Sequence, residues 1–269
     1  GWSLWGNTAS VFSNQGINIL LNIFFGTVIN AARGIAFQVE GAVSGFVINL
    51  QLAINPQIIK SYAARDIKYM HQLIFQGAKL SFFLLFFICF PIILEIEFIL
   101  KLWLVNFPKY TVIFTKLVLV NALINSLSGS LRTAVQATGE IKLFQIIVGG
   151  MLLLNLPISY IFLESGFSPE MVFYVSIILS ILTFWARLVI ACSLVGFSVI
   201  DFIINVFLKI FFTVSLSYCI HVIFIKSFEY IANNQLITIF MTLFFTLLSI
   251  IFTGLSFNER KYILKLIKK

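Results

Sequence analysis

Two charged residues in an apolar stretch of the chain are the first candidates for chemistry. Arg33 and Glu40 share one face of a helix and lie about 10 Å apart along its axis, because a helix rises about 1.5 Å per residue. A guanidinium suits bidentate contact with phosphate, and a carboxylate can bind sugar hydroxyls or a coupling cation. A charge inside a bilayer costs about 3 kcal/mol or more, so we expect both side chains to face water or a partner. The alternative for Arg33 is that it reaches toward lipid headgroups from the end of its helix.

Asparagine side chains and a third charge complete the candidate binding set. Asn14 and Asn18 lie on one stripe of a helix, and Asn125 and Arg132 share a stripe farther along the chain. The amides could bind sugar hydroxyls or, equally well, hydrogen-bond a neighbouring helix. Arg132 stands near a helix end, where an anchoring role is favoured over contact with a substrate headgroup. The sequence therefore predicts six substrate-binding residues, namely Arg33, Glu40, Asn14, Asn18, Asn125 and Arg132.

No pattern in the sequence indicates catalysis, a metal site or a cofactor. The three cysteines, Cys89, Cys192 and Cys219, lack the CxxC spacing of zinc sites, and only His71 and His221 accompany them. The chain has no G-x-S-x-G, P-loop or H-E-x-x-H motif. We therefore expect a protein that is not an enzyme and that needs no cofactor. For His221, a hydrogen bond to a neighbouring helix is favoured over a proton relay.

The composition places these residues in a membrane. Of the 269 residues 60% are hydrophobic and 10% are charged, whereas soluble domains carry about 25% charged residues. The net charge of +8 comes from cations that stand in short segments between apolar runs and not on one basic face. This arrangement favours membrane topology over nucleic-acid binding. We expect an integral membrane protein whose partners include lipids and no nucleic acid.

Eight apolar runs are long enough to cross a bilayer, which takes about 20 residues of helix. They cover residues 2–25, 33–56, 73–99, 111–136, 142–163, 171–194, 204–225 and 236–256. The runs do not alternate with period two, so the sequence predicts an all-α bundle of eight transmembrane helices and not a β-barrel. We expect residues 1–200 to form a core bundle of six spans, residues 201–256 to add two spans, and residues 257–269 to form a basic cytoplasmic tail.

Charges in the connections predict the orientation of the spans. Cations gather in alternate connections and near the end of the chain, at Lys60, Arg65, Lys68, Arg132, Lys142, Arg260 and Lys261. By the positive-inside rule these segments are cytoplasmic, which places both ends of the chain in the cytoplasm. Lys79 and Arg187 also stand near inner ends of spans and are interpreted mainly as topology charges. The chain begins with Gly and shows no signal peptide, so we expect it to start partway through a longer protein.

Proline and glycine suggest how the second span ends and packs. Pro56 predicts a break after that span, and the segment from Pro56 to about Gln72 could lie along the membrane surface as an amphipathic helix. Gly34, Gly41 and Gly45 fall on one face, where small residues let two helix backbones approach closely. The sequence therefore predicts a helix-packing role for these glycines.

Several stretches resemble the second half of a family of bacterial transporters. They are NILLNIFFG, NAARGIAFQV and NPQIIKSYA near the start, NSLSGSLRTAVQATGEIKLFQ at 125–145 and NLPISYIFL at 155–163. With these stretches the chain resembles the membrane proteins of bacterial polysaccharide biosynthesis, the flippases of lipid-linked O-antigen and capsule repeat units. That family belongs to the superfamily of multidrug, oligosaccharidyl-lipid and polysaccharide exporters.

The resemblance implies a fold and a function. It implies the second lobe of a two-lobe transporter in the bacterial inner membrane, with the N-terminal lobe as a partner missing from this chain. The implied substrate is an undecaprenyl-pyrophosphate-linked oligosaccharide, carried to the outer face by alternating access. An amide is usual in the relatives where Glu40 stands here, so a role at that position does not transfer directly.

Three other functions compete with the flippase interpretation. A multidrug exporter of the same superfamily would want an acidic cavity, which Arg33 and Glu40 together do not provide. A membrane-embedded glycan polymerase or transferase would need a sizeable outer loop or an acidic catalytic motif, and neither is visible. A membrane scaffold without transport would have little use for charges within its spans.

Overall fold

The computed structural model describes residues 2–228, 234–256 and 259–260, and their regular structure is helical throughout. The elements are α1 (Trp2–Phe25), α2 (Thr27–Ala63), α3 (Ile67–Leu94), α4 (Ile96–Leu104), α5 (Thr111–Ser126), α6 (Gly129–Thr138), α7 (Ile141–Leu153), α8 (Asn155–Glu164), α9 (Met171–Val195), α10 (Val199–Phe202), η1 (Ile203–Phe207), α11 (Leu208–Ser227), α13 (Gln235–Ser249) and η2 (Ile250–Gly254). η1 and η2 are single π-helical turns continuous with their neighbours. No strand occurs in this part of the chain.

Among the described residues, seven helical segments are long and apolar enough to cross a membrane, judged by length and composition. They are Thr27–Ala63, Ile67–Leu94, Thr111–Thr138, Ile141–Glu164, Met171–Val195, Val199–Ser227 and Gln235–Gly254. The chain is thus an all-helical, multi-pass membrane protein, and the predicted fold class is confirmed in outline. The first predicted span is a helix, α1, but it is not among the seven because amides such as Asn14, Asn18 and Asn22 lower its hydropathy.

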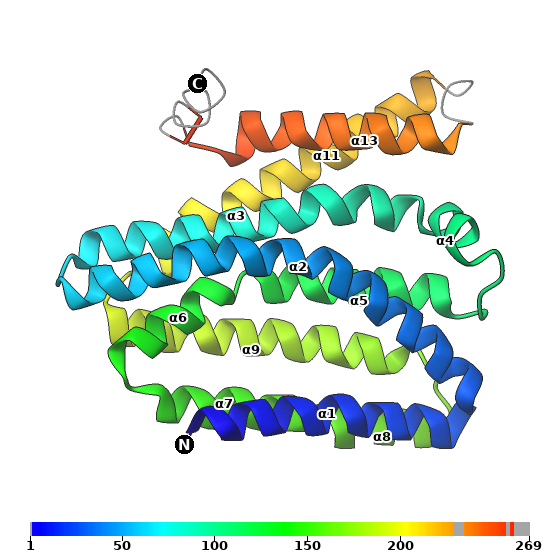
Figure 1. Cartoon of the computed structure of the whole chain (residues 1–269), viewed down its shortest axis with the longest axis horizontal. Coiled ribbons are helices and arrows are strands. Elements are labelled where there is room, and N and C mark those ends of the chain that lie inside the picture. The colour runs from blue at the N-terminus through cyan, green and yellow to red at the C-terminus, as the bar shows by residue number, and fades with distance from the viewer. Residues whose placement is uncertain (1, 229–233, 257–258, 261–269) are drawn as a thin grey trace.

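The helices run side by side along the length of the molecule (Figure 1). α1 packs along α7 and α8, whereas α2 packs along α3, α5 and α6. α9 lies between these groups and contacts α5, α6, α7 and α8. α11 and α13 pack on each other at one side of the bundle, where α13 contacts α3.

The connections alternate between the two ends of the bundle (Figure 1). One end holds the turns at 64–66, 139–140 and 196–198. The other end holds the turn at Gly26, the segment 95–110 and the turn at 165–170. Basic residues predicted to be cytoplasmic, such as Arg65 and Lys142, therefore share one end of the molecule.

α3 is the helix most enclosed by others, and its packing shows what holds the bundle together. Ile74, Ala78, Leu85 and Cys89 are at most 1% exposed. Apolar contact between helices gains little over contact with lipid tails, so association depends on close fit. Such a fit occurs at Gly77, where an added Cβ would lie 3.2 Å from Ile54 Cγ2 of α2 and closer still to Ser130 Oγ of α6.

The predicted break at Pro56 is wrong. α2 continues through Pro56 to Ala63, and the turn at 64–66 leads directly into α3. Pro56 is exposed, so its ring displaces no packed neighbour, and the helix continues although proline cannot donate a backbone hydrogen bond. Asp66 then caps α3 by accepting a hydrogen bond from the Tyr69 backbone N–H at 3.1 Å. No separate surface helix therefore lies between the second and third spans.

The packing role predicted for three glycines of α2 is also not seen. A Cβ placed on Gly34, Gly41 or Gly45 would meet nothing within 4 Å among the described residues. Close approach of helices at glycine does occur in this protein, but at other glycines than these three. Besides Gly77, Gly129 approaches the Gln51 side chain of α2 closely.

Polar side chains join α11 to η2 and to α13. Thr213 and Thr253 lie 2.9 Å apart at Oγ1, and His221 Nδ1 lies 3.0 Å from Thr242 Oγ1. The interhelical hydrogen bond expected for His221 is thus confirmed. Thr246, on the same face of α13, is fully buried and donates to the Thr242 carbonyl, as is usual for hydroxyls inside membrane helices.

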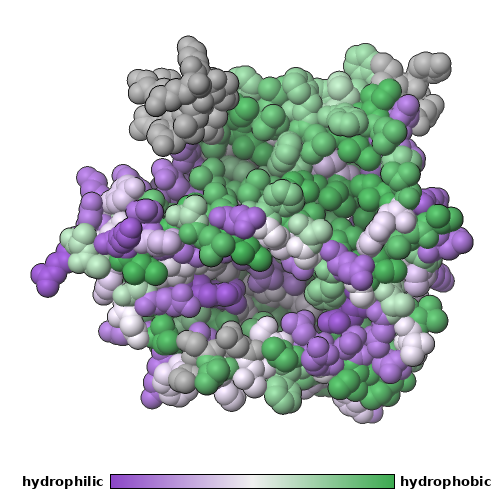
Figure 2. Space-filling view, in the orientation of Figure 1, coloured by the Kyte–Doolittle hydropathy of each residue, from purple (hydrophilic) through white to green (hydrophobic). Residues whose placement is uncertain are grey.

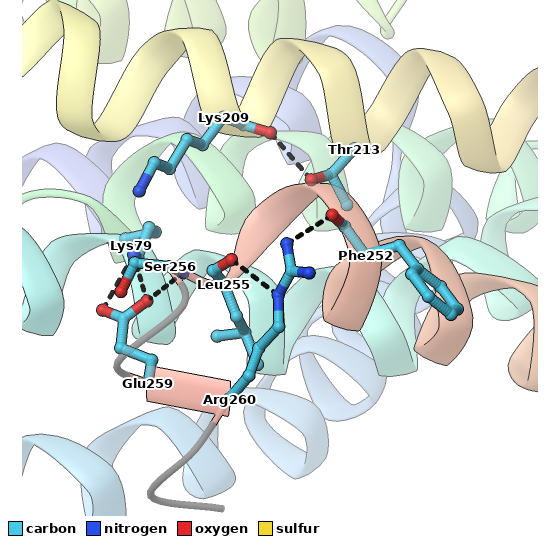
Figure 3. A network of polar contacts seen from close by, with 8 residues as sticks. All are labelled: Lys79, Lys209, Thr213, Phe252, Leu255, Ser256, Glu259 and Arg260. Atoms are coloured by element: carbon cyan, nitrogen blue, oxygen red, sulfur yellow. Dashed lines mark hydrogen bonds and ion pairs between the residues drawn. The ribbon is translucent and has the colours of Figure 1, made fainter.

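A buried ion pair connects the end of the described chain to α3 (Figure 3). Lys79 Nζ lies 2.7 Å from Glu259 Oε2, and the two side chains are 4% and 13% exposed. Glu259 also accepts from the Ser256 backbone N–H at 2.7 Å, while Arg260 donates to the Leu255 and Phe252 carbonyls. Lys209 of α11 extends toward the pair. Interpreting Lys79 as a topology charge was therefore wrong, and the remainder of the predicted basic tail, 257–258 and 261–269, lies outside the described residues.

Candidate binding cavity

α1 and α2 diverge from the tight turn at Gly26, whose φ of 80° suits a residue without a Cβ. Between the diverging helices lies a cavity of about 550 Å³, backed by α5 to α9. Figure 2 shows this hollow on the flank of the bundle, with hydrophilic residues along its rims. Its polar lining residues are Ser10, Ser13, Asn14, Arg33, Glu40, Ser44, Asn121, Asn125, Ser126, Arg132, Gln136, Gln145, Asn155, Ser176, Ser180 and Arg187.

Arg33 lines the cavity and also connects the two helices that open it. Its Nη1 donates to Asn18 Oδ1 at 3.3 Å and its Nη2 donates to the Asn14 carbonyl at 3.2 Å. The guanidinium carbon lies 4.5 Å from the centroid of the Phe37 ring, within cation–π range. Arg33 is therefore anchored by protein groups on α1 and α2, and its half-buried side chain presents only part of its charge to the cavity.

Glu40 lies farther along α2 and faces the same cavity. One carboxylate oxygen accepts a hydrogen bond from Ser44 Oγ at 2.6 Å, and the side chain is half-buried. No ion pair joins Glu40 to Arg33 or to another described cation, as the seven-residue spacing predicts. The second carboxylate oxygen therefore has no described partner and remains available to a ligand.

The predicted asparagines divide between the cavity and the helix contacts. Asn14 and Asn125 line the cavity, and Asn125 donates to Ser180 Oγ at 3.3 Å and to the Asn121 carbonyl. Asn18 does not line it, because its side chain accepts from Arg33 and its carbonyl accepts from Asn30. Of the six predicted site residues, five converge on one cavity and Asn18 supports one of them.

Arg187 is a cavity residue that was interpreted from sequence as a topology charge, and the structure corrects this. It is 4% exposed, lines the cavity and lies close enough to Arg132 for their charges to interact. A periodic signal was present, since Ser176, Ser180, Thr183 and Arg187 recur at the spacing of one helical face. The position of Arg187 near the end of its helix favoured a topology charge, although the stripe indicates a polar face.

The electrostatic character of the cavity is cationic. Three arginines and one glutamate line it, which gives a formal charge of +2. No group of three metal-ligating side chains occurs among the described residues. Amides and hydroxyls supply both donors and acceptors, so the cavity can bind a polar ligand that carries negative charge.

Comparison with known proteins leaves this geometry as the main guide to function. No family model, no curated protein and no solved structure matches the chain. The class of protein is therefore defined by the fold and the cavity: a multi-pass helical membrane protein with a polar, cationic hollow in its flank.

Proposed function

We propose that the chain is the C-terminal lobe of a flippase for a lipid-linked oligosaccharide, an undecaprenyl-pyrophosphate glycan unit, in the bacterial inner membrane. The observation that carries the proposal is the cationic cavity of about 550 Å³ inside an otherwise apolar bundle. The resemblance of stretches within residues 18–63, and of residues 125–145 and 155–163, to polysaccharide-biosynthesis flippases supplies the substrate class and the direction, from the inner face to the outer face.

The cavity lining suits the parts of such a substrate. Asn14 keeps one amide N–H and its Oδ1 for a ligand, and Asn125 keeps its Oδ1, which together match sugar hydroxyls. The excess of guanidinium groups suits the diphosphate, and the exposed apolar surface of the bundle suits the prenyl tail. Transport would follow from alternating access, with the N-terminal lobe as the partner against which this lobe moves.

The cavity favours the flippase over its competitors. An exporter of cationic drugs would want carboxylates, and Glu40 is the single carboxylate among the described lining residues. A glycan polymerase or transferase would need acidic catalytic groups close together, and the same lining offers no second one. The protein we propose is therefore a transporter and not an enzyme.

A transport assay on the intact two-lobe protein tests the proposal. The protein is reconstituted into liposomes with a fluorescent prenyl-diphosphate-linked oligosaccharide, and flipping is measured as the fraction of glycan protected from an impermeant lectin. Asn125→Leu, which removes a cavity amide, should slow flipping at least about tenfold. Asn205→Leu, which alters an exposed amide outside the cavity, should not. Equal flipping by protein-free liposomes, or strong drug efflux without flipping, would overturn the proposal.

A further inference from the structure

Two arginines face the cavity from adjacent helices without a counter-ion. Arg132 of α6 and Arg187 of α9 both line the cavity, and their charges repel each other. The ion pairs of the described residues are Lys79–Glu259 and Lys101–Glu97, so neither arginine meets a carboxylate there. Arg187 Nε is buried and has no hydrogen-bond partner in the part of the chain that the structure describes. The positive charge at this point of the cavity is therefore uncompensated.

The two arginines stand at similar depths along their helices. Arg132 stands six residues before Thr138 and Arg187 eight residues before Val195, and both helices end at the same side of the molecule (Figure 1). At about 1.5 Å of rise per residue, both lie about 10 Å inside that end. Arg132 is exposed to the cavity, whereas Arg187 is only 4% exposed, so a buried charge beside a like charge is unfavourable unless an anion binds to both.

We propose that Arg132 and Arg187 form a binding site for a phosphate or diphosphate group. Two guanidinium forks present several parallel N–H donors, which match the oxygens of a phosphoryl group better than a halide or a single carboxylate. A diphosphate also carries enough negative charge to neutralise both arginines. Ser180, whose Oγ accepts from Asn125, keeps its own hydroxyl proton for a ligand in the same cavity.

This site is distinct from Arg33, the arginine that the sequence favoured for phosphate contact. Arg33 stands six residues after the start of α2, toward the opposite end of the bundle, and already donates to Asn14 and Asn18. The proposal deepens the proposed function and rests on it for the identity of the substrate. The anion site itself rests on the geometry of Arg132 and Arg187.

Ligand binding to the purified 269-residue chain tests the site. Inorganic pyrophosphate and farnesyl diphosphate are titrated by calorimetry and by the shift in thermal unfolding midpoint. Arg187→Met and Arg132→Met should each weaken binding at least about tenfold. Arg65→Met, the same change at an exposed arginine in the turn at 64–66, should leave binding unchanged.

The stability of the ligand-free protein provides a second readout. Because Arg187→Met removes the buried member of two repelling charges, it should raise the ligand-free unfolding midpoint while abolishing the shift caused by pyrophosphate. Arg187→Lys keeps the charge, so a folded protein that binds diphosphate more weakly than wild type is expected. An Arg187→Met protein that is less stable than wild type and binds pyrophosphate equally well would overturn the proposal.

The two ligands and a lipid competitor identify the source of the phosphate. Equal, arginine-dependent binding of both ligands supports recognition of the diphosphate alone, and binding of farnesyl diphosphate only supports a lipid-linked ligand. Displacement by phosphatidylglycerol at comparable concentration would point to a bulk lipid headgroup, still at the same two arginines. Failure of all three to bind overturns the site. Arginine-dependent binding without glycan flipping by the intact protein would keep the site and remove the proposed function.

Discussion

At the scale of single residues, Arg33 shows how one side chain serves both the cavity and the fold. Its two hydrogen bonds to Asn14 and Asn18 join α2 to α1, and its contact with the Phe37 ring, one turn farther along α2, holds the guanidinium on its own helix. Hydrogen bonds made by a charged group contribute about 1.5–3 kcal/mol each when they are not replaced by water. A change at Arg33 therefore acts on stability as well as on any ligand.

We predict that Arg33→Ala lowers the free energy of unfolding by about 1–3 kcal/mol, because α1 loses two hydrogen-bonding contacts with α2. Arg33→Lys keeps the charge but loses the fork, and should fall between wild type and Arg33→Ala. Thermal unfolding of the purified chain measures both. Lys60→Ala, at an exposed cation of the same helix, is the control with little expected effect. An Arg33→Ala protein as stable as that control would show that the contacts to α1 are weak.

Helical periodicity predicted much of this cavity and failed at identifiable places. The stripe through Arg33 and Glu40 was read correctly because side-chain direction follows from position along a helix. Periodicity cannot say what stands opposite a stripe, so it could not tell that Asn18 faces Arg33 while Asn125 faces the cavity. Arg187 was missed because its depth depends on where the neighbouring helices end.

At the scale of helices, the meaning of glycine and proline is decided by what lies across from them. Counting apolar residues located the spans, since length and hydropathy are local properties. The predictions for Pro56 and Gly41 were wrong because they depend on tertiary structure. The sequence does not show that the helix continues after Pro56 or that the space beside Gly41 is open. Gly77, which carried no prediction, is a glycine closely approached by two helices, α2 and α6.

A matched pair of substitutions tests this difference. Gly77→Val should lower the free energy of unfolding by about 1–3 kcal/mol, because its side chain would meet Ile54 and Ser130. Gly41→Val should leave it unchanged or raise it slightly, since nothing lies within 4 Å and valine favours a helix more than glycine does. Denaturant or thermal unfolding in detergent measures both. Equal damage at the two positions would contradict the packing described for α3.

At the scale of the whole molecule, one ion pair joins positions 180 residues apart in sequence, Lys79 and Glu259. Burial raises the pKa of Glu259, but the hydrogen bonds from Lys79 and from the Ser256 backbone, with the Lys79 charge, lower that pKa below its usual range. A carboxyl whose pKa is lowered in the folded state stabilises the fold above its ordinary pKa, and this contribution disappears as the pH falls through the lowered value.

We predict that Glu259→Gln destabilises the chain by about 3 kcal/mol at neutral pH, because it leaves Lys79 buried without a counter-charge. The difference from wild type should begin to shrink as the pH falls below about 4.5, the ordinary value for this group, because the unfolded wild-type chain then binds a proton at position 259 that the folded chain binds only at lower pH. Glu97→Gln breaks an ion pair of the same 2.7 Å length whose side chains are exposed, and should cost less than about 1 kcal/mol. Unfolding midpoints of wild type and Glu259→Gln, measured across pH 3 to 7, test this prediction. A difference between the two proteins that does not change with pH would show that the charge of Glu259 is unimportant.

The alternation of connections between the two ends predicts their sidedness. In a background without Cys89, Cys192 and Cys219, Ala64→Cys should resist a membrane-impermeant maleimide in intact cells, whereas Ser168→Cys should react. Both positions are exposed, and they lie at opposite ends of the bundle. Permeabilised cells provide the control in which both should react. The reverse pattern would place the basic end of the molecule outside the cell.

The parting of α1 from α2 puts a slot in the side wall of the bundle, and α1 carries exposed apolar side chains such as Val11, Phe12 and Ile19. A passenger molecule with a long alkyl tail would then need to bring only its polar head group between the two helices, while the tail stayed outside in the hydrocarbon of the membrane. How bulky a head can pass would be set by the distance from α1 to α2, with no dependence on the length of the tail.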